Sequence, residues 1–152
     1  MMPAIIYQSP IGPLYIAEQG GAITHLVFSP MFGDIGTSPV LDECVRQLTA
    51  YFNGELRQFD LPLAPKGTAF QQRVWQALQT IPYGTTWSYK ALAEAAESPQ
   101  GFRAVGLANN KNPISILIPC HRVVGISGKL TGYGGGLDKK AHLLKLEGVS
   151  LP

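Results

Sequence analysis

Apolar and polar residues alternate along the first part of the chain and later follow a helical spacing, so two periodicities divide the sequence into a strand-rich and a helix-rich part. Residues 4–8 and 13–17 flank a Ser-Pro-Ile-Gly turn at residues 9–12 and predict a β-hairpin. Residues 23–28 predict a third strand. Residues 30–39 are rich in glycine and proline and predict a surface loop.

Helical spacing of apolar side chains begins after this loop. The pattern predicts a helix over residues 40–52, which Asn53-Gly54 ends, and a second helix over residues 70–81. Between them, residues 59–67 contain two prolines and predict a linker. A last helix is predicted over residues 139–147.

Two short helices separated by a tight turn follow the second helix. Ser88 is placed to N-cap the first of them, which runs to Ala96. Ser98 and Pro99 are placed as the N-cap and first residue of the next helix, which runs to about Asn109. The pair predicts a helix-turn-helix.

The order of these elements predicts an α+β fold made of two small domains. We expect an N-terminal, β-rich α/β domain over residues 1–62 to support a mainly helical C-terminal domain over residues 68–152, which contains the helix-turn-helix. A length of 152 residues suffices for one core or for two half-domains that share an interface. Hydrophobic residues make up 45% and charged residues 14%, which excludes a disordered or fibrous protein.

Charge and cysteine content narrow the class of partner. A net charge of +2 without a run of lysine and arginine permits a nucleic-acid partner, which would be bound by shape and scattered contacts. Cys44 and Cys120 are too few for a disulfide framework. The N-terminus lacks the pattern of a signal peptide, and no apolar run approaches the roughly 18 residues of a membrane span. We therefore expect a cytoplasmic protein with free thiols and no membrane partner.

One short stretch of the C-terminal part combines the residue types that nucleophilic chemistry needs. Residues 114–118 are apolar and predict a buried extended segment, after which Pro119 sets Cys120 at a bend. A thiol there, next to His121 and Arg122, is expected to have a lowered pKa. The alternative is a buried cysteine that acts as a small hydrophobe. Because neighbours in an extended chain point to opposite faces, a bridging water or another base is favoured over direct contact between Cys120 and His121.

A glycine-rich loop over residues 131–137 opens the last predicted helix. Glycines let a ligand approach the backbone closely and leave N–H groups free to bind it, although an ordinary flexible turn has the same composition. The helix places Glu147 in its final turn, where a carboxylate is unfavourable for the helix dipole. Glu147 is then either solvated or held by a partner such as His121.

The second helix of the predicted pair presents small residues and a single charge. Its outer positions are Gln100, Gly101, Arg103, Ala104 and Ala108. Proteins that read base sequence usually offer several Arg, Asn or Gln side chains. A smooth helix instead suits close approach to a groove without sequence selection, with Arg103 entering the base stack. Tight packing on a neighbouring helix is the alternative.

Together these residues resemble the O6-alkylguanine-DNA alkyltransferase family, the methylated-DNA–protein-cysteine methyltransferases. The resemblance covers residues 68–148 and rests on several motifs in order. The motifs are Ser88-Tyr89, Arg103-Ala104-Val105-Gly106, Asn112-Pro113, Pro119-Cys120-His121-Arg122-Val123-Val124, Tyr133 with its glycines, and Leu146-Glu147-Gly148. The cysteine-containing motif is identical to the active-site motif of the family.

The resemblance implies catalytic roles for five residues. Cys120 would accept the alkyl group, and His121 would deprotonate it through a water molecule. Glu147 would orient His121, and Asn112 would brace the active-site turn. Tyr89 would press on the DNA backbone at the flipped nucleotide and protonate the leaving guanine at N3.

The resemblance also implies DNA-binding and pocket residues. Arg103 would fill the gap left by the flipped base, with Gly101, Phe102 and Ala104 beside it. The wall of the base pocket would be formed by Tyr133, Gly134, Gly135 and Val123. Phe102 stands where the family usually has a small residue, so it is either a core residue or a changed groove contact. Gly134 stands where many members have serine, which would remove a hydrogen bond to the base.

The implied function is direct-reversal DNA repair. The protein would transfer an alkyl group from O6 of guanine in double-stranded DNA to Cys120 once, with base flipping and self-inactivation. O4 of thymine is a further candidate substrate. The reaction needs no cofactor and no metal, and the protein is expected to be a monomer.

Three other functions fit parts of the pattern. A helix-turn-helix protein that senses alkylated DNA without repairing it would have an unreactive Cys120 and form no covalent product. A cysteine hydrolase or transferase would need direct contact between a thiol and an imidazole, and an oxyanion hole. A metal site would need closer ligands than His25, His121 and His142, which are widely spaced in the sequence.

Overall fold

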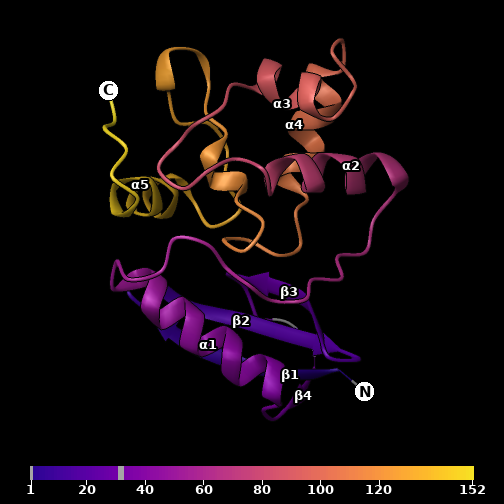
Figure 1. The fold of residues 1–152 in the computed structure, drawn as a ribbon, viewed down its shortest axis with the longest axis vertical. Coiled ribbons are helices and arrows are strands. Elements are labelled where there is room, and N and C mark those ends of the chain that lie inside the picture. The colour runs from indigo at the N-terminus through magenta and orange to yellow at the C-terminus, as the bar shows by residue number, and fades with distance from the viewer. Residues whose placement is uncertain (1, 31–32) are drawn as a thin grey trace.

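A four-stranded sheet with one helix forms one end of the molecule, and a group of helices forms the other (Figure 1). The computed structural model describes residues 2–30 and 33–152. Strands β1 (Pro3–Ser9), β2 (Gly12–Gln19) and β3 (Ala22–Val27) form an antiparallel meander. The short β4 (Asp34–Ile35) runs parallel to β1, so the strand order is β3-β2-β1-β4. The predicted α+β class and the three predicted strands are confirmed.

The predicted loop over residues 30–39 is wrong at β4. The chain returns here to the edge of β1, where the Asp34 amide donates to the Met2 carbonyl at 3.0 Å and the Gly36 amide donates to the Ala4 carbonyl at 3.1 Å. Residues 31–32 of the predicted loop lie outside the described residues. Both residues of β4 are exposed, so the strand carries no apolar alternation from which periodicity could predict it.

One helix, α1 (Pro39–Phe52), packs against β1, β2 and β3. Ser38 caps it by accepting a hydrogen bond from the Leu41 amide, and Pro39 takes the first position, where no amide hydrogen is needed. Leu41 and Leu48 are completely buried on the side of α1 that belongs to the core. The predicted helix over residues 40–52 is therefore confirmed.

Backbone hydrogen bonds along the outer edge of β3 connect the sheet to the rest of the chain. The Ile23 amide donates to the Pro62 carbonyl and the Ala64 amide donates back to the Ile23 carbonyl, both at 2.8 Å. Further along the same edge, the Leu26 amide donates to the Pro113 carbonyl at 2.9 Å, and the Ser115 amide donates to the Leu26 carbonyl at 3.0 Å. The predicted linker over residues 59–67 is thus paired with the sheet at residues 62–64, and the segment that precedes Cys120 begins beside the same strand.

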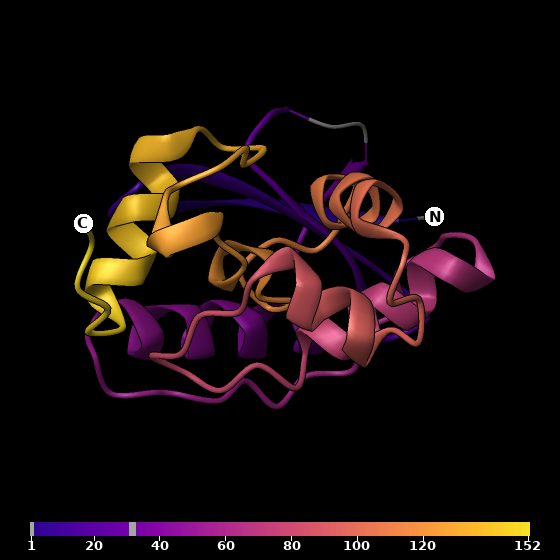
Figure 2. The same cartoon turned by 90° about the horizontal axis from the view of Figure 1, so that it is seen from above.

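The helical part contains α2, α3, α4 and α5 and two single 3-10 turns. These elements span α2 (Ala69–Leu78), α3 (Tyr89–Ala95), α4 (Phe102–Asn110), η1 (Cys120–Arg122), η2 (Ile126–Gly128) and α5 (Leu137–Leu146). A capping box of Thr68 and Gln71 starts α2, which ends three residues before the predicted end at Ile81. Seen from above, α5 and the α3–α4 pair lie on different sides of the molecule (Figure 2). No helix among the described residues is long and apolar enough to cross a membrane.

The helix-turn-helix has a longer turn than predicted. Ser88 caps α3 as expected, by accepting from the Ala91 amide at 3.1 Å. The second helix begins at Phe102 rather than at Pro99, and Ser98 does not cap it. Pro99 lies inside a turn that is closed by a 2.8 Å hydrogen bond from the Gly101 amide to the Ser98 carbonyl. The fixed backbone angle of proline suits the second position of such a turn as well as a first helical position, so the sequence pattern alone did not separate the two.

Candidate active site

The segment that leads to Cys120 is a tight turn. The predicted extended conformation of residues 114–118 is wrong, because pairing with β3 ends at the Ser115 amide and the Ile118 amide donates back to the Ile114 carbonyl at 3.0 Å. The predicted burial is confirmed, since Ile114, Ile116 and Ile118 are all at most 1% exposed. Apolar β-branched residues indicate burial well, but they do not distinguish a strand from a buried turn.

Asn112 holds this turn from the inside. Its side-chain amide donates to the Ile118 carbonyl at 2.8 Å, and its side-chain oxygen accepts from the Ile114 amide at 2.9 Å. Between these anchors Ile116 adopts a φ of +71°, which is costly for a β-branched residue, about 1–3 kcal/mol. The two hydrogen bonds of Asn112 and the buried apolar contacts offset this strain.

Cys120 opens η1 at the end of the turn and is 5% exposed. Burial raises the pKa of its thiol, while a hydrogen bond with Asn112 and the charge of Lys140 lower it without reversing the shift. The predicted lowered pKa is therefore wrong for the free protein. The low dielectric around the sulfur penalises a thiolate more than the neighbouring donors stabilise it. Nucleophilic chemistry at Cys120 then requires a base that removes the thiol proton.

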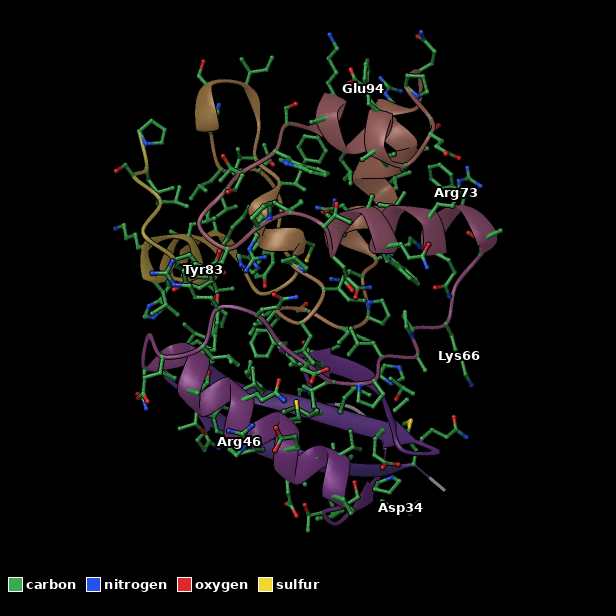
Figure 3. The ribbon with its side chains drawn as sticks, viewed as in Figure 1. Asp34, Arg46, Lys66, Arg73, Tyr83 and Glu94 are labelled. Atoms are coloured by element: carbon green, nitrogen blue, oxygen red, sulfur yellow. The ribbon has the colours of Figure 1, made fainter. Side chains whose placement is uncertain are left out.

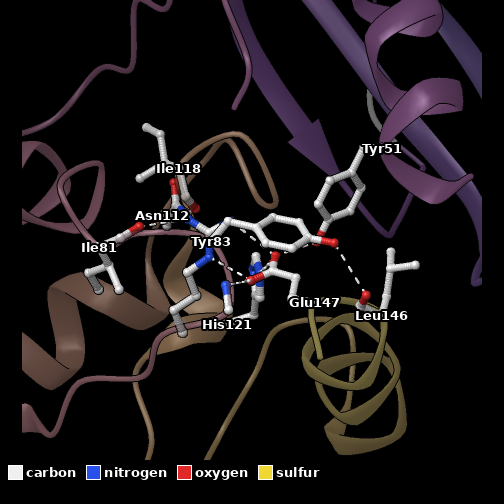
Figure 4. A network of polar contacts seen from close by, with 10 residues as sticks. Tyr51, Ile81, Tyr83, Asn112, Ile118, His121, Leu146 and Glu147 are labelled. Carbon is white, nitrogen blue, oxygen red and sulfur yellow. Dashed lines mark hydrogen bonds and ion pairs between the residues drawn. The ribbon is translucent and has the colours of Figure 1, made fainter. Parts of the chain in front are cut away.

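Glu147 is the centre of a buried polar network (Figure 4). It follows α5 as the C-cap residue and is 5% exposed, so the solvated alternative is excluded. Its carboxylate accepts from Tyr51 at 2.5 Å, from His121 Nε2 at 2.8 Å, and from Arg122 Nε at 2.8 Å and Nη2 at 3.0 Å. The Gly84 amide adds a fifth donor at 3.2 Å. Burial alone would raise the pKa of Glu147, but the hydrogen bonds from His121 and Arg122 outweigh it and lower the pKa below its ordinary value.

The network fixes the proton arrangement of His121. An ionised carboxylate can only accept, so the hydrogen of the imidazole must lie on Nε2, which donates to Glu147. Nδ1 then carries a free lone pair; it is buried and has no hydrogen-bond partner among the described residues. Burial lowers the pKa of His121 more than Glu147 raises it, so the ring is neutral at pH 7. A neutral imidazole with an unprotonated Nδ1 can act as a general base.

Two members of the network were not predicted as site residues. Arg122 is 7% exposed, and besides Glu147 it binds the Ile81 carbonyl through Nη1 at 2.7 Å. Tyr51 reaches Glu147 from α1, across 96 residues of sequence, and its apolar pattern had indicated only a core position. Arg122 stands next to His121 in the sequence, which was a usable signal. Tyr83 lies at the junction of the two parts (Figure 3), with the guanidinium of Arg122 over its ring at 5.8 Å.

A cavity of about 370 Å³ opens beside Cys120. Its lining combines residues of both parts of the chain, namely Val27, Phe28, Ser29, Pro30, Asn109, Asn110, Asn112, Ser115, Cys120, Tyr133 and Gly134. Tyr133 and Gly134 were predicted here, whereas Gly135 and Val123 are not part of the lining. Gly135 lies against the Phe28 ring, which a Cβ atom at this position would meet at 2.9 Å. The sheet therefore contributes one wall of the cavity, because Val27 is the last residue of β3 and residues 28–30 follow it directly.

Tyr89 on α3 and Lys140 on α5 both form hydrogen bonds to Thr131, the first residue of the glycine-rich loop. The Tyr89 hydroxyl lies 2.7 Å from the hydroxyl of Thr131. Lys140 is completely buried and donates to the Val123 carbonyl at 2.6 Å and to the Thr131 carbonyl at 3.0 Å. Burial lowers the pKa of Lys140 from 10.5 to about 8, which leaves most of it charged at pH 7. The predicted lysine-containing helix did not indicate a buried ammonium, since lysines are mostly exposed.

The predicted groove-facing residues of α4 lie on its exposed side. Arg103 and Ala104 are exposed and Gly101 is half-buried. Phe102 is 47% exposed, so it is not a core residue. Ala108, which was expected on the outer side, is 3% exposed and belongs to the core. The helix thus presents a nearly uncharged surface with a single arginine.

Among the described residues, no group of three or more His, Cys, Asp and Glu side chains is close enough to hold a metal ion. Cys44 and Cys120 are both free and buried.

Comparison with known proteins gives matches over nearly the whole chain. Residues 4–65 match the sequence model described as the ribonuclease-like domain of 6-O-methylguanine DNA methyltransferase, and residues 69–149 match its DNA binding domain. A methylated-DNA–protein-cysteine methyltransferase of Methanosarcina barkeri is 52% identical over 149 residues, which are 93% of this chain and 94% of the relative. The corresponding protein of Mycobacterium leprae is 53% identical over 145 residues, 91% of this chain and 88% of the relative.

Solved structures agree with these matches. The crystal structure of the O6-methylguanine methyltransferase of Mycobacterium tuberculosis superimposes with a TM-score of 0.88 at 49% identity, over 97% of this chain and 93% of that one. The Mycobacterium tuberculosis OGT in complex with DNA gives a TM-score of 0.88 at 50% identity, over 96% of this chain and 93% of that one.

Proposed function

Because the chain belongs to the 6-O-methylguanine DNA methyltransferase family, we propose that Cys120 is the residue onto which it takes the alkyl group. The protein repairs DNA by moving an alkyl group from O6 of guanine to one of its own cysteines. One observation carries the assignment: Cys120 lines the cavity and follows the Asn112 turn. Cys44 is not among the residues that line this cavity; it is completely buried, and burial raises the pKa of its thiol to about 12.

The proton arrangement supports His121 as the base, positioned by Glu147. Both the thiol of Cys120 and the imidazole of His121 are neutral at pH 7, since burial raises the pKa of the first and lowers that of the second. The thiol proton would pass through a water molecule to Nδ1 of His121. Glu147 accepts from Nε2 and would stabilise the imidazolium that forms. Arg122 keeps the carboxylate ionised at the same time.

Transfer itself is a single displacement at the alkyl carbon. The thiolate of Cys120 forms the sulfur–carbon bond while the carbon–O6 bond breaks, and the bonding pair stays on the guanine. The guanine anion then takes up a proton, so the proton lost by the thiol is balanced by the proton gained by the guanine. Tyr89 is proposed as the donor of that proton at N3, because its hydroxyl lies beside the glycine loop. The carbon–sulfur bond of a thioether is stable to hydrolysis, which makes the reaction a single turnover.

The lesion must leave the duplex before it can reach Cys120. O6 of a paired guanine lies inside the helix, so the nucleotide has to be extruded, and a damaged base costs less to extrude. The cavity of about 370 Å³ is proposed to receive it against Tyr133 and Gly134. Arg103 on the exposed side of α4 is proposed to fill the gap in the stack, with Gly101, Phe102 and Ala104 against the groove.

Intact-protein mass tests the acceptor. The protein is mixed with duplex DNA that carries one O6-methylguanine, and the modified peptide is located by fragmentation. We expect one added methyl group per protein on Cys120, none in Cys120→Ala, and an unchanged result in the matched control Cys44→Ala. A methyl group elsewhere, or transfer that persists in Cys120→Ala, would remove the proposed role. Tight binding to the lesion without a mass change would instead favour a non-catalytic sensor.

The role of Arg103 separates base extrusion from chemistry. Arg103→Ala is expected to slow repair of the duplex much more than reaction with free O6-benzylguanine, which needs no extrusion. Equal losses on both substrates would contradict the assignment. A free thiol acceptor requires a reducing compartment, which supports the cytoplasm as the site of action.

A further inference from the structure

The cavity beside Cys120 contains a buried polar side chain to which no role has been assigned. Asn109, in the last turn of α4, lines the cavity and is only 2% exposed. Its side-chain oxygen Oδ1 is buried and has no hydrogen-bond partner among the described residues. The position of this turn is fixed, because the Trp75 indole donates to the carbonyl of the preceding Ala108 at 2.9 Å.

Asn112 shows what a structural asparagine looks like in the same cavity. Both ends of its side-chain amide are hydrogen-bonded to the backbone of the active-site turn, and Asn112 also forms a hydrogen bond with Cys120, so its side chain is committed to holding this turn. Within the part of the chain that the structure describes, Oδ1 of Asn109 accepts no such bond. Buried polar groups without a partner are rare in folded proteins, because their lost contact with water is not compensated. An unpaired acceptor in a binding cavity is explained when the ligand brings the donor.

The chemistry of the lesion limits which donor this can be. Alkylation of O6 removes the hydrogen from N1 of guanine, so the only N–H donor left on the base is its exocyclic 2-amino group. Alkylation of O4 likewise removes the hydrogen from N3 of thymine, which leaves that base without any N–H donor. An acceptor in the cavity can therefore distinguish the two lesions.

We propose that Asn109 is a specificity residue whose Oδ1 accepts a hydrogen bond from the 2-amino group of an extruded O6-alkylguanine. This inference rests on the proposed function, since it assumes that the cavity receives the base. A site built to pair with a polar group rejects an analogue that lacks it, because the buried partner stays unsatisfied. Asn109 thus favours guanine lesions over O4-alkylthymine.

Substrate analogues test the hydrogen bond directly. The rate of Cys120 methylation is measured on three duplexes, which carry O6-methylguanine, O6-methylhypoxanthine or O4-methylthymine. O6-methylhypoxanthine differs from O6-methylguanine only in lacking the 2-amino group. We expect the wild-type protein to react about 10-fold faster with O6-methylguanine than with O6-methylhypoxanthine, a factor expected for one unsatisfied buried group. Equal wild-type rates on these two duplexes overturn the proposal without any variant.

The variant Asn109→Leu assigns the discrimination to this side chain. In this variant, the ratio of the Cys120 methylation rates on O6-methylguanine and O6-methylhypoxanthine is expected to fall close to one. The main cause is slower reaction with O6-methylguanine. Asn109→Ser, which is smaller, provides the same comparison if the leucine variant does not fold. The matched control Asn53→Leu changes an exposed asparagine at the end of α1 and is expected to keep the wild-type ratio. A wild-type ratio in a folded Asn109 variant overturns the proposal.

The outcomes also separate this inference from the proposed function. If no duplex methylates Cys120, the proposed function fails. If Cys120 is methylated at rates that ignore the 2-amino group, only the role of Asn109 fails.

Discussion

The hydrogen bond between Tyr51 and Glu147 provides a sharp test of how the sheet end of the molecule stabilises the active site. Tyr51→Phe removes one hydroxyl and keeps the buried ring. The centroid of this ring lies 5.3 Å from that of Phe52 and 5.1 Å from that of Phe59. Glu147 keeps its other donors, so the buried ion pair is not broken. The variant therefore isolates a single hydrogen bond to a charged acceptor.

The expected loss follows from that chemistry. A hydrogen bond to a charged group contributes about 1.5–3 kcal/mol, whereas breaking a buried ion pair costs about 3–5 kcal/mol. We therefore expect Tyr51→Phe to lower the free energy of unfolding by about 1.5–3 kcal/mol, equivalent to roughly 3–12 °C in Tm for a chain of this size. Glu147→Gln should cost more, because it leaves the guanidinium of Arg122 without its counter-ion. Since His121 keeps its bond to Glu147, alkyl transfer should persist in Tyr51→Phe.

Urea unfolding at pH 7 with linear extrapolation measures the loss. Tyr83→Phe is the matched control, because the Tyr83 hydroxyl donates to the neutral carbonyl of Leu146 at 3.2 Å and is expected to contribute only about 0.5–1.5 kcal/mol. In the double variant with Glu147→Gln, Tyr51→Phe should cost clearly less than it does alone. A Tyr51→Phe loss below about 0.5 kcal/mol, or no larger than that of Tyr83→Phe, would refute the reasoning.

Three further predictions concern the same site. Asn112→Ala leaves two backbone groups of the active-site turn unpaired and should lower the free energy of unfolding by about 2–5 kcal/mol in the urea assay; a loss under about 1 kcal/mol would contradict the bracing role. Gly135→Ala should cost about 1–3 kcal/mol by the same measurement, because the new Cβ would lie 2.9 Å from the Phe28 ring. Gly134→Ala, whose Cβ would meet nothing within 4 Å, should cost less than about 0.5 kcal/mol, and equal losses at the two glycines would count against this difference. Because burial lowers the pKa of His121 below its usual 6.5 and only the neutral ring can accept the thiol proton, the transfer rate should fall on acidification with a midpoint below pH 6.5; a midpoint above 6.5 would contradict a buried His121 as this base.

Local patterns predicted most of the elements, because the interactions that start and end them are local. The hairpin of β1 and β2 and the cap of α3 by Ser88 involve residues close in sequence. The prediction failed where two local solutions were open to the same residues. Pro99 fits both a turn and a helix start, and the apolar segment before Cys120 fits both a strand and a buried turn.

The roles in the candidate site divide in a similar way. The cysteine motif and its neighbours indicated Cys120, His121 and Asn112, since their order along the chain resembles that of a known family. The glycine loop indicated Tyr133, which the structure places in the cavity. Asn109 carried no signal, because an asparagine near the end of a helix usually is solvated or caps it.

By itself, the sequence determined the fold class and most elements, because residue types and periodicity act over a few positions, and its resemblance to a known family pointed to Cys120 as the proposed nucleophile. Only the tertiary structure decided how the site is charged. The carboxylate of Glu147 meets Tyr51 across 96 residues, and the free edge of β3 receives the segment that precedes Cys120. For the same reason, the pKa of the Cys120 thiol is raised, whereas the sequence had predicted that it is lowered. Desolvation and hydrogen bonding depend on which groups surround an atom in space, and neighbours in the sequence do not specify them.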